Sequence, residues 1–471
     1  MALLLAPALS QAAEETASPA PSVPFLLLWS LPFVLILLSI ALLPLLPRVA
    51  HWWERNRNKL RVALGLSFLM VFYYLFRPAG FDGAAAGLGS VGRMLKHSVL
   101  DDYVPFIVLL FSLFTISGGI RLTGDVPAHP ATNVLILFVG AILASLIGTT
   151  GASMVLIRPL LQINSERKHV KHTVVFFIFL VSNIGGCLLP VGDPPLFLGY
   201  LRGVPFLWTL HLAPEWLAAV LTVLAIYWAL DSWVWRHEDV ESLRLDEAIR
   251  EPLRLHGWRN LALLAGVVGS VALLVPGRPL PLIGWRLPDL FLREIVQGVL
   301  CAVSLWITPK KRREDNQFTF HAIAEVACLF VGIFITMQAP IELLDLQGAR
   351  LGLNSPMHFF WASGALSSFL DNAPTYVVFF EAASHLHAPA GVPLLKILAG
   401  GGRIPMHLLE AISLGSVFMG ANTYIGNGPN FLVKSIAEHH GVRMPSFFGY
   451  MVYSGLVLIP TFIVLSLVFF K

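Results

Sequence analysis

Runs of about 18 or more apolar residues recur along the whole chain, and they constrain its fold more than any other feature. Clear examples are Pro24–Leu46, Ala213–Trp235 and Phe447–Phe470. A helix of this length crosses the roughly 30 Å hydrocarbon core of a bilayer while pairing its own backbone groups. Because 56% of the residues are hydrophobic and only 13% are charged, a soluble domain could not bury this much apolar surface. The sequence therefore predicts an all-α polytopic membrane protein.

We expect five crossings in each half of the chain, together with one shorter hairpin. The crossings are predicted at 24–46, 61–77, 104–121, 172–201 and 213–235, and then at 259–276, 289–308, 320–340, 404–438 and 446–470. Segments 132–163 and 356–386 each hold two apolar arms of about 15 residues around a polar tip, too short for two spans. Each is predicted to be a re-entrant hairpin, which is tolerated where it lines a cavity. Because five is odd, residues 24–235 and 259–471 would form two inverted repeats.

The hairpin tips and the middles of crossings 172–201 and 404–438 interrupt the apolar sequence with Gly, Pro, Asn, Ser, Thr and carboxylates. The interruptions are Ile147–Ser153, Ser182–Gly186 and Val191–Leu198 in the first half, and Phe369–Thr375, Gly420–Thr423 and Ile425–Leu432 in the second. Corresponding broken segments in two halves of a membrane protein indicate a transporter binding site. The residues expected to break the backbone are Gly185, Gly186, Gly192, Pro194, Pro195, Pro374, Gly426, Gly428 and Pro429.

Helices that stop inside the membrane leave unpaired N–H groups at one end and unpaired carbonyls at the other. Carbonyl, hydroxyl and amide oxygens suit Na+, whereas helix N-termini suit an anion. The residues expected to supply neutral oxygens or to hold the site open are Thr149, Thr150, Ser182, Asn183, Asn372, Asn422, Thr423 and Asn427. Asp193 and Asn427 are also predicted to be the N-caps of the restarting half-helices.

Two aspartates, Asp193 and Asp371, lie at these interruptions, and an ionisable side chain inside a membrane is a functional hypothesis by default. We expect the pair to bind dehydrated Na+ and to exchange it for protons, so Na+ is the only metal ion predicted. Helix capping is the alternative role for both, and it is compatible with ion binding. Arg158, in the returning arm of the first hairpin, either holds an anionic substrate, pairs with an aspartate, or anchors the hairpin near the cytoplasmic surface.

Charge predicts the orientation of the chain. The predicted cytoplasmic loops carry the basic clusters Arg48–Arg61, Arg167–Lys171, Arg236–Arg254 and Lys310–Arg313, and the predicted outside loops are poorer in Lys and Arg. By the positive-inside rule, the N-terminus would lie outside a bacterial inner membrane. Residues 236–258 would form a charged cytoplasmic linker helix without chemistry of its own. Residues 1–23 are either a disordered lead-in or a weak signal segment, because they lack a basic start.

Several classes of function are disfavoured by the residues. No GxxxxGK[ST] phosphate-binding loop occurs, which argues against an ATP-driven pump. The net charge of +4 is explained by loop Lys and Arg, so no nucleic-acid partner is expected. The three cysteines fall in apolar runs and predict neither a disulfide nor a metal site. No cofactor and no enzymatic activity are expected. An intramembrane protease would also need buried aspartates, but the paired interruptions argue against it.

The motifs Ser182–Gly186, Gly192–Pro195, Asp371–Pro374 and Ala421–Thr423 resemble those of the ion transporter superfamily, most closely its NhaD-like antiporter and citrate-transporter branch. The resemblance extends over nearly the whole chain after about residue 25. It implies inverted repeats arranged as a scaffold and a transport domain, usually in a homodimer that moves by an elevator motion. It also implies a cargo of Na+ against H+, of arsenite, or of di- and tricarboxylates with Na+.

The hairpin tips depart from one branch of that superfamily. Sodium–dicarboxylate symporters carry Ser-Asn-Thr at both tips, whereas the tips here read Gly148–Gly151 and Asp371–Pro374, and the carboxylate favours a cation. We therefore interpret the chain as a secondary active transporter, first as a Na+/H+ antiporter working by alternating access. The alternative is a Na+- or H+-coupled citrate or di- and tricarboxylate transporter. The expected partners are membrane lipid, the transported Na+, H+ or small organic anion, and a second copy of the chain.

Overall fold

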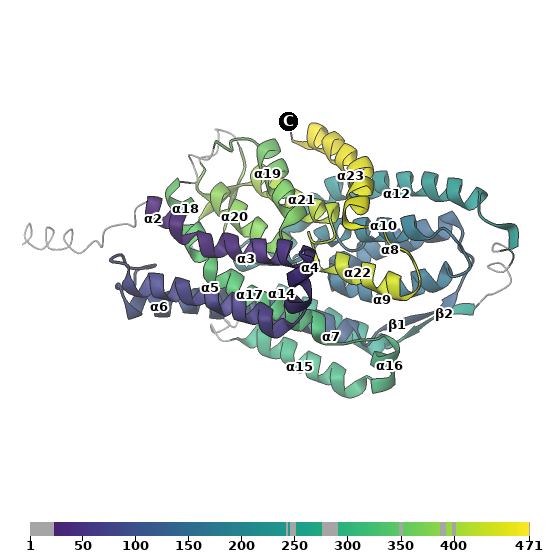
Figure 1. Cartoon of the computed structure of the whole chain (residues 1–471), viewed down its shortest axis with the longest axis horizontal. Coiled ribbons are helices and arrows are strands. Elements are labelled where there is room, and N and C mark those ends of the chain that lie inside the picture. Colours follow the sequence, from purple (N-terminus) through teal and green to yellow (C-terminus); the bar gives the residue numbers. More distant parts are fainter. Residues whose placement is uncertain are drawn as a thin grey trace, which may run out of the picture. The chain divides into compact units, whose positions relative to one another are not determined.

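The computed structural model of the chain describes residues 23–241, 244, 251–275, 291–347, 352–386, 392–397 and 402–470. Almost all of the regular structure in these residues is helical (Figure 1). Seven helical segments among them are long and apolar enough to cross a membrane: Val23–Leu42, Asn56–Phe76, Leu88–Ser117, Pro130–Ile147, Phe206–Arg236, His321–Gln347 and Phe447–Phe469. The prediction of an all-α polytopic membrane protein is confirmed. Except for Val23, the predicted lead-in lies outside the described residues.

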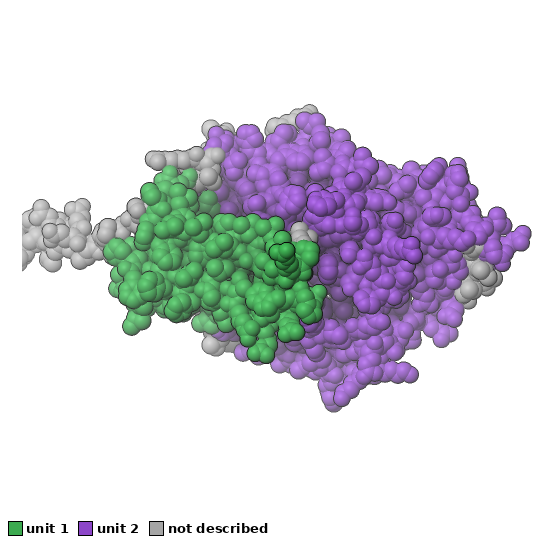
Figure 2. All heavy atoms as spheres, viewed as in Figure 1, with its two compact units in different colours: residues 1–104, 326–347 green, residues 105–325, 348–471 purple. Residues whose placement is uncertain are grey.

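The chain divides into two compact units, coloured green and purple in Figure 2. Unit 1 comprises residues 1–104 and 326–347, and unit 2 comprises residues 105–325 and 348–471. Each predicted repeat therefore contributes residues to both units. The predicted site residues all fall in unit 2.

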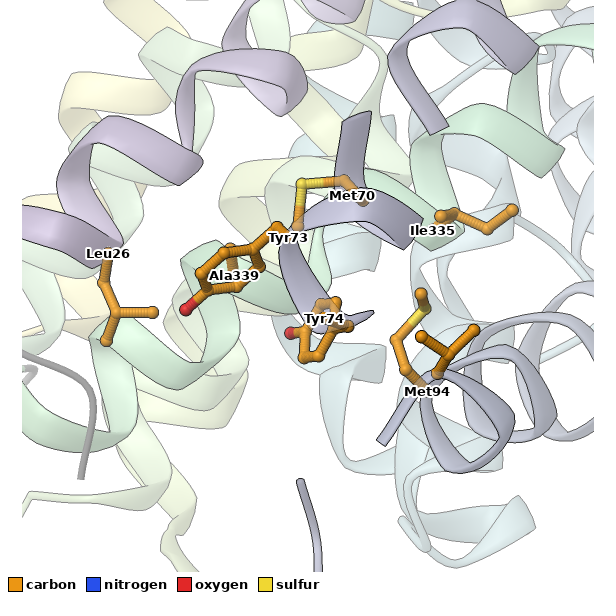
Figure 3. Close-up of a cluster of buried hydrophobic side chains, with 8 residues drawn as sticks. Leu26, Met70, Tyr73, Tyr74, Met94, Ile335 and Ala339 are labelled. Carbon is orange, nitrogen blue, oxygen red and sulfur yellow. The ribbon is translucent and has the colours of Figure 1, made fainter. Parts of the chain in front are cut away.

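Unit 1 consists of helices packed around an aromatic core. It contains α2 (Val23–Trp29), α3 (Leu31–Leu42), η1 (Leu43–Leu45), α4 (Pro47–Trp53), α5 (Asn56–Phe76), α6 (Leu88–Leu95), the π-helical η2 (Lys96–Tyr103), most of α17 (His321–Thr336) and α18 (Gln338–Gln347). The core residues are Leu26, Met70, Tyr73, Tyr74, Val91, Met94, Ile335 and Ala339 (Figure 3). They come from five helices in two separate stretches of the sequence, so burying them fixes how this unit packs.

One buried charge pair lies beside that core. Arg77 forms an ion pair with Glu342 at 2.7 Å, and its guanidinium lies 4.3 Å from the centre of the Tyr74 ring. Pairing and cation–π contact offset the cost of burying the arginine. Other helix faces of unit 1 expose large apolar side chains such as Leu27, Phe68 and Phe76. Lipid-facing helices are expected to have such faces.

Unit 2 contains the predicted hairpins and broken helices. Its first part has α7 (Val104–Ser117), β1 (Arg121–Asp125), α8 (Pro130–Ile147), α9 (Thr149–Ile163), α10 (Lys171–Leu180), η3 (Ile184–Cys187), α11 (Pro194–Leu201), η4 (Phe206–Leu212) and α12 (Ala213–Arg236). Its second part has β2 (Glu251–His256), α14 (Trp258–Leu273), α15 (Leu292–Ile307), α16 (Lys310–Asp315), α19 (Pro356–Phe369), α20 (Asn372–Ser384), β3 (Leu394–Lys396), β4 (Arg403–Pro405), α21 (Met406–Met419), η6 (Gly420–Asn422), α22 (Gly428–His439) and α23 (Phe447–Phe469).

Both predicted hairpins are present as pairs of contacting helices. Only Gly148 separates α8 from α9, and its φ of +82° is a left-handed conformation that favours glycine. Leu370 and Asp371 separate α19 from α20. Helix α8 has 18 residues, so it is longer than the predicted arm and long enough to span a membrane. Entry of each hairpin from one side of the membrane stays a prediction.

Two predicted segments differ from the structure. The prediction of a linker helix at 236–258 is wrong at its C-terminal end, because residues 251–256 form β2 and pair antiparallel with β1 (Figure 1). Its residues 242, 243 and 245–250 lie outside the described residues. The crossing expected at 104–121 ends at Ser117 instead, and its helix begins upstream at Leu88. Gly118 and Gly119 follow the helix, and a Cβ on Gly119 would collide with Asn260.

Candidate functional site

Two helices of unit 2 are interrupted in the same way. After α10 the chain passes through η3 and restarts as α11 at Pro194, and after α21 it passes through η6 and restarts as α22. The prediction that Asp193 and Asn427 occupy the N-cap positions is confirmed. Asp193 has φ −144° and ψ 143°, and Asn427 has φ −152° and ψ 142°. The two restarts therefore have the same backbone conformation.

Close backbone packing explains most of the predicted glycines. A Cβ on Gly192 would collide with the carbonyl oxygen of Gly186, and a Cβ on Gly426 would collide with the carbonyl oxygen of Gly420. A Cβ on Gly185 would lie 2.6 Å from the Ala141 backbone. All of these positions require glycine because of space. Pro194 and Pro429 lie in the first turns of their helices, as predicted, where a missing N–H costs nothing.

The hairpins meet the broken helices through equivalent serines. Ser145, near the end of α8, donates to the Gly185 carbonyl and accepts from the Leu188 N–H at 3.0 Å. Ser368, near the end of α19, donates to the Met419 carbonyl at 3.2 Å and accepts from the Asn422 amide at 2.9 Å. Neither serine was predicted from the sequence to belong to the site. The signal was present, because each stands three residues before the N-cap position of its hairpin's second arm.

Asp193 is the centre of the site. Its Oδ1 accepts hydrogen bonds from Thr149 Oγ1 at 3.0 Å and from Asn427 Nδ2 at 3.1 Å. Its Oδ2 accepts from Asn372 Nδ2 at 2.6 Å. The donors belong to the first hairpin tip, the second restart and the second hairpin tip, so all of the predicted interruptions except the η3 and η6 turns reach one carboxylate. We call Asp193, Thr149, Asn372 and Asn427 the aspartate junction.

Asp193 and Asp371 use their side chains differently. Asp193 occupies an N-cap position, but its side chain makes no capping hydrogen bond and is directed to the junction. Asp371 does cap its helix, since its Oδ1 accepts from the Ala373 N–H at 3.1 Å. The geometry therefore supports an ion-binding role for Asp193 more strongly than for Asp371. A shared role of the two in binding Na+ stays a hypothesis.

A second layer of amides fixes the orientation of Asn183. Asn430 donates to the carbonyls of Gly420 and Thr423, both at 2.9 Å, so its own Oδ1 must accept, and it does so from Asn183 Nδ2 at 2.7 Å. Asn183 Oδ1 is consequently directed away and has no hydrogen-bond partner among the described residues. Sequence analysis missed Asn430, although it lies directly after Pro429 in the second interruption.

Gly420 packs closely against these amides. A Cβ added to Gly420 would lie 3.1 Å from Asn183 Oδ1 and 3.7 Å from Asn372 Nδ2. Asn372 is oriented by its bond to Asp193, and its buried Oδ1 likewise has no partner among the described residues. Buried amide oxygens without donors are suited to a cation, because leaving them unpaired is costly. Asn183 Oδ1 and Asn372 Oδ1 are therefore candidate cation ligands.

The remaining predicted residues lie around the junction. Ser182 shares a hydrogen bond with Ser153 at 2.9 Å, and its carbonyl accepts from Asn427. Asn422 and Thr423 both bond to Ser368 and so hold the second hairpin against η6. Thr150 is one residue beyond Thr149 and is partly exposed. These contacts make Ser182, Asn422 and Thr423 supports of the junction. Asn422 Oδ1 is a further buried oxygen that has no hydrogen-bond partner in the part of the chain that the structure describes.

The charge of the junction is uncompensated. Asp193 is 2% exposed, and its three side-chain donors are all neutral. No lysine or arginine among the described residues forms an ion pair with Asp193 or Asp371. A buried carboxylate held only by neutral donors retains a net negative charge, which is costly unless a cation or proton joins it. The arrangement can therefore bind and release a small cation.

The sequence matches one family of known proteins. A family model described as "Putative citrate transport" matches residues 22–470. No curated protein matches the chain.

Proposed function

The chain belongs to the family described as putative citrate transport, and we propose that it carries a citrate-like carboxylate coupled to Na+ or H+. The family is one of membrane transporters, and seven described helical segments can span a bilayer. Both facts agree with the resemblance to the ion transporter superfamily. The match does not extend to its NhaD-like branch, so a sodium/proton antiporter has no support from the family.

The aspartate junction is the observation that supports cation coupling. Both hairpin tips and both helix restarts come together at this carboxylate, and its charge is balanced by no cationic side chain among the described residues. A bound Na+ or proton would neutralise the Asp193 carboxylate. Loss of that cation would disfavour the conformation in which the hairpin tips and helix restarts meet at Asp193. A cation and a carboxylate substrate bound near one another also attract, which links their binding.

A specific observation favours Na+/H+ exchange as a second candidate. The side chains that contact Asp193 are all neutral, so the junction by itself provides a cation site and no paired cationic group for an organic anion. Na+ and H+ would then compete for the same carboxylate oxygens. This candidate needs no other binding site, whereas the carboxylate carrier needs one.

Transport by purified protein in liposomes tests the two candidates. Uptake of labelled citrate is measured under an inward Na+ gradient, an inward proton gradient, and no gradient, with protein-free liposomes as the control. A trapped pH dye reports Na+-driven proton movement in the absence of citrate. We expect gradient-dependent citrate uptake and no Na+-driven pH change without citrate. A Na+-driven pH change without citrate uptake would instead assign the second candidate, and neither signal would reject both.

Further features of this transport are proposed with it. We propose alternating access of the elevator type, a homodimer, and placement in a bacterial inner membrane with the N-terminus outside. The support for the orientation is the basic character of the loops at Arg167–Lys171 and Lys310–Arg313. No enzymatic role is proposed, because the family is one of transporters.

A further inference from the structure

A large cavity opens into unit 2 beside the first hairpin. Its volume is about 1190 Å³, and it is lined by parts of β1, α9, the turn between α9 and α10, the end of α12 and the turn after α22. Helix α9 and the turn that follows α22 line it, and α9 and α22 contact one another (Figure 1). We call it the basic cavity, because its charged lining is dominated by arginine and lysine.

Half of the arginines and lysines in this lining are already paired with carboxylates. Arg121 pairs with Asp315, Arg167 pairs with the fully buried Asp231 at 2.7 Å, and Lys168 pairs with Asp239 at 2.9 Å. The lining residues Arg158, Lys171 and Arg443 form no ion pair within the part of the chain that the structure describes. Lys171 and Arg443 are exposed, so water solvates them.

Arg158 is different, because part of its guanidinium is buried. Its Nε and Nη1 atoms are inaccessible to solvent, and neither has a hydrogen-bond partner among the described residues. Arg121 is near enough to repel it electrostatically. Unpaired, buried N–H donors on a cation are costly. A carboxylate accepts from one of these donors together with Nη2, which share one edge of the planar guanidinium.

The position of Arg158 connects the cavity to the aspartate junction. Arg158 is nine residues after Thr149 on the same helix, which corresponds to about 13 Å along the axis. The lining also includes Met154, five residues after Thr149 and about 7 Å along the axis. The cavity therefore extends along α9 from the basic loop toward the hairpin tip that donates to Asp193.

We propose that the basic cavity is a capture site for polycarboxylate anions, with Arg158 as the residue that binds one carboxylate of the substrate. The proposal rests on the proposed carboxylate transport and adds where the anion binds on the side of the membrane that carries the basic loops. Lys171 and Arg443 attract the anion to the cavity, and Arg158 holds it closer to the aspartate junction. The cation site at Asp193 and the anion site at Arg158 then lie in the same unit, near the two ends of α9.

The wall of the cavity is rigid enough to hold this geometry. The carboxylate of Asp231 accepts from Arg167 and lies 2.8 Å from His172 Nε2, while Asn133 and Asn164 exchange amide hydrogen bonds at 2.9 Å. Arg167, His172 and Asn164 all line the cavity. This buried network joins α8, α10 and α12 around the base of α9, so Arg158 is presented by a fixed helix.

Citrate kinetics of variants provide the first test. Arg158→Gln should raise the KM for citrate about tenfold or more, because it removes a charged bidentate contact, and Arg158→Lys should restore part of the loss. Lys434→Gln is the matched control, since Lys434 lies outside the cavity and its charge is paired with Glu438 at 3.1 Å. An unchanged KM in Arg158→Gln, with wild-type citrate transport intact, would overturn the capture site but leave the proposed function standing.

Thiol labelling provides a test that does not depend on transport. Gln162 lines the cavity and is exposed, so Gln162→Cys can be modified by small thiol reagents, with the wild-type chain as the background control. An anionic reagent should react faster than a cationic one of the same size, and citrate should slow both. Adding Arg158→Gln should reduce the preference and the protection. Should that variant not fold, Lys171→Gln with Arg443→Gln must reduce the preference instead.

The two tests separate failure of the capture site from failure of the proposed function. If the wild-type protein transports no citrate, the proposed function fails whatever the labelling shows. If it transports citrate but the cavity labels without preference for the anionic reagent and without citrate protection, only the capture site fails. Protection by inorganic phosphate at the same concentration as by citrate would also overturn it, because the site would then be a general anion site and not one for polycarboxylates.

Discussion

Asp193 and Asn427 occupy equivalent places in the two broken helices, and the single charge between them decides what the junction can bind. Their backbone angles agree within about ten degrees, and both side chains are buried. Asn427 Nδ2 donates hydrogen bonds to the Asp193 carboxylate and to the Ser182 carbonyl. One half of the chain thus supplies the acid and the other half supplies a neutral donor. Two acids at these places would repel each other, and two amides would leave nothing to attract a cation.

Replacing Asp193 with asparagine tests this reading at the residue scale. Asp193→Asn keeps the size of the side chain and removes its charge, so the protein should fold while cation-coupled transport is lost. Stabilisation of the purified protein by Na+ should be lost as well, because the variant has no charge to balance a cation. Transport in liposomes and unfolding in detergent with and without Na+ measure the two effects. Wild-type transport in this variant would remove Asp193 from the site.

Asp371 offers a matched comparison. Asparagine is as good an N-cap as aspartate, so Asp371→Asn should preserve the bond from the Ala373 N–H and should leave stability and most transport intact. Asp371→Ala removes the cap and should lower the free energy of unfolding by about 1 kcal/mol. Abolition of transport in a stable Asp371→Asn variant would show that this carboxylate also binds the cation, as the sequence analysis predicted.

At the scale of single elements, the sequence predicts those helices and turns whose bounds depend on the length of an apolar run and on turn-forming residues. The hairpins and the broken helices are predicted nearly to their bounds, because Gly, Pro and Asn interrupt otherwise apolar runs. The pairing of β1 with β2 is not predictable in this way, because Arg121 pairs with His256 across the intervening hairpin and helices. The direction of the Asp193 side chain is also not predictable from the sequence, because hydrogen-bond donors from distant segments orient it away from its own helix.

The restart glycines give a prediction at this scale. Gly192→Ala and Gly426→Ala should each destabilise the protein by about 1–3 kcal/mol, because the new Cβ would collide with a backbone carbonyl that cannot move independently. Gly428→Ala is the control, since no atom lies within 4 Å of its Cβ position. Gly428 was expected to be needed for the break, and the structure gives no steric reason for it. Thermal unfolding in detergent measures all three, and equal damage at Gly428 would contradict the steric argument.

At the scale of the whole molecule, the paired contacts of Ser145 and Ser368 support two related halves. The inverted orientation of those halves is a separate prediction, based on the odd number of crossings and on loop charge. Lys168, in the turn after α9, and Lys396, in β3, are both exposed and should then face opposite sides of the membrane. Single cysteines at these positions, labelled with an impermeant reagent in oriented vesicles, test this. Labelling of both from the same side would exclude inverted repeats.

The two candidate functions place opposite demands on the whole molecule. A Na+/H+ antiporter must let Na+ and H+ compete for the Asp193 oxygens, so Na+ should stabilise the protein less at low pH, because a protonated carboxyl is a poor Na+ ligand. Citrate alone should then have little effect. A coupled carboxylate carrier must bind both ligands in one state, so citrate should stabilise the protein and Na+ should strengthen that effect.

Thermal unfolding of the purified protein with Na+, citrate or both, over a pH series, separates these demands. We expect stabilisation by citrate that depends on Na+ or on low pH, which is the result linkage requires when the cation neutralises Asp193 beside an anion. A ligand at a hundred times its Kd adds about 2.7 kcal/mol to the free energy of unfolding, which is large enough to measure. In Asp193→Asn, citrate stabilisation should lose its dependence on Na+, because the cation then has no charged partner. Stabilisation by Na+ alone, weakened by acid and indifferent to citrate, would instead establish the exchanger.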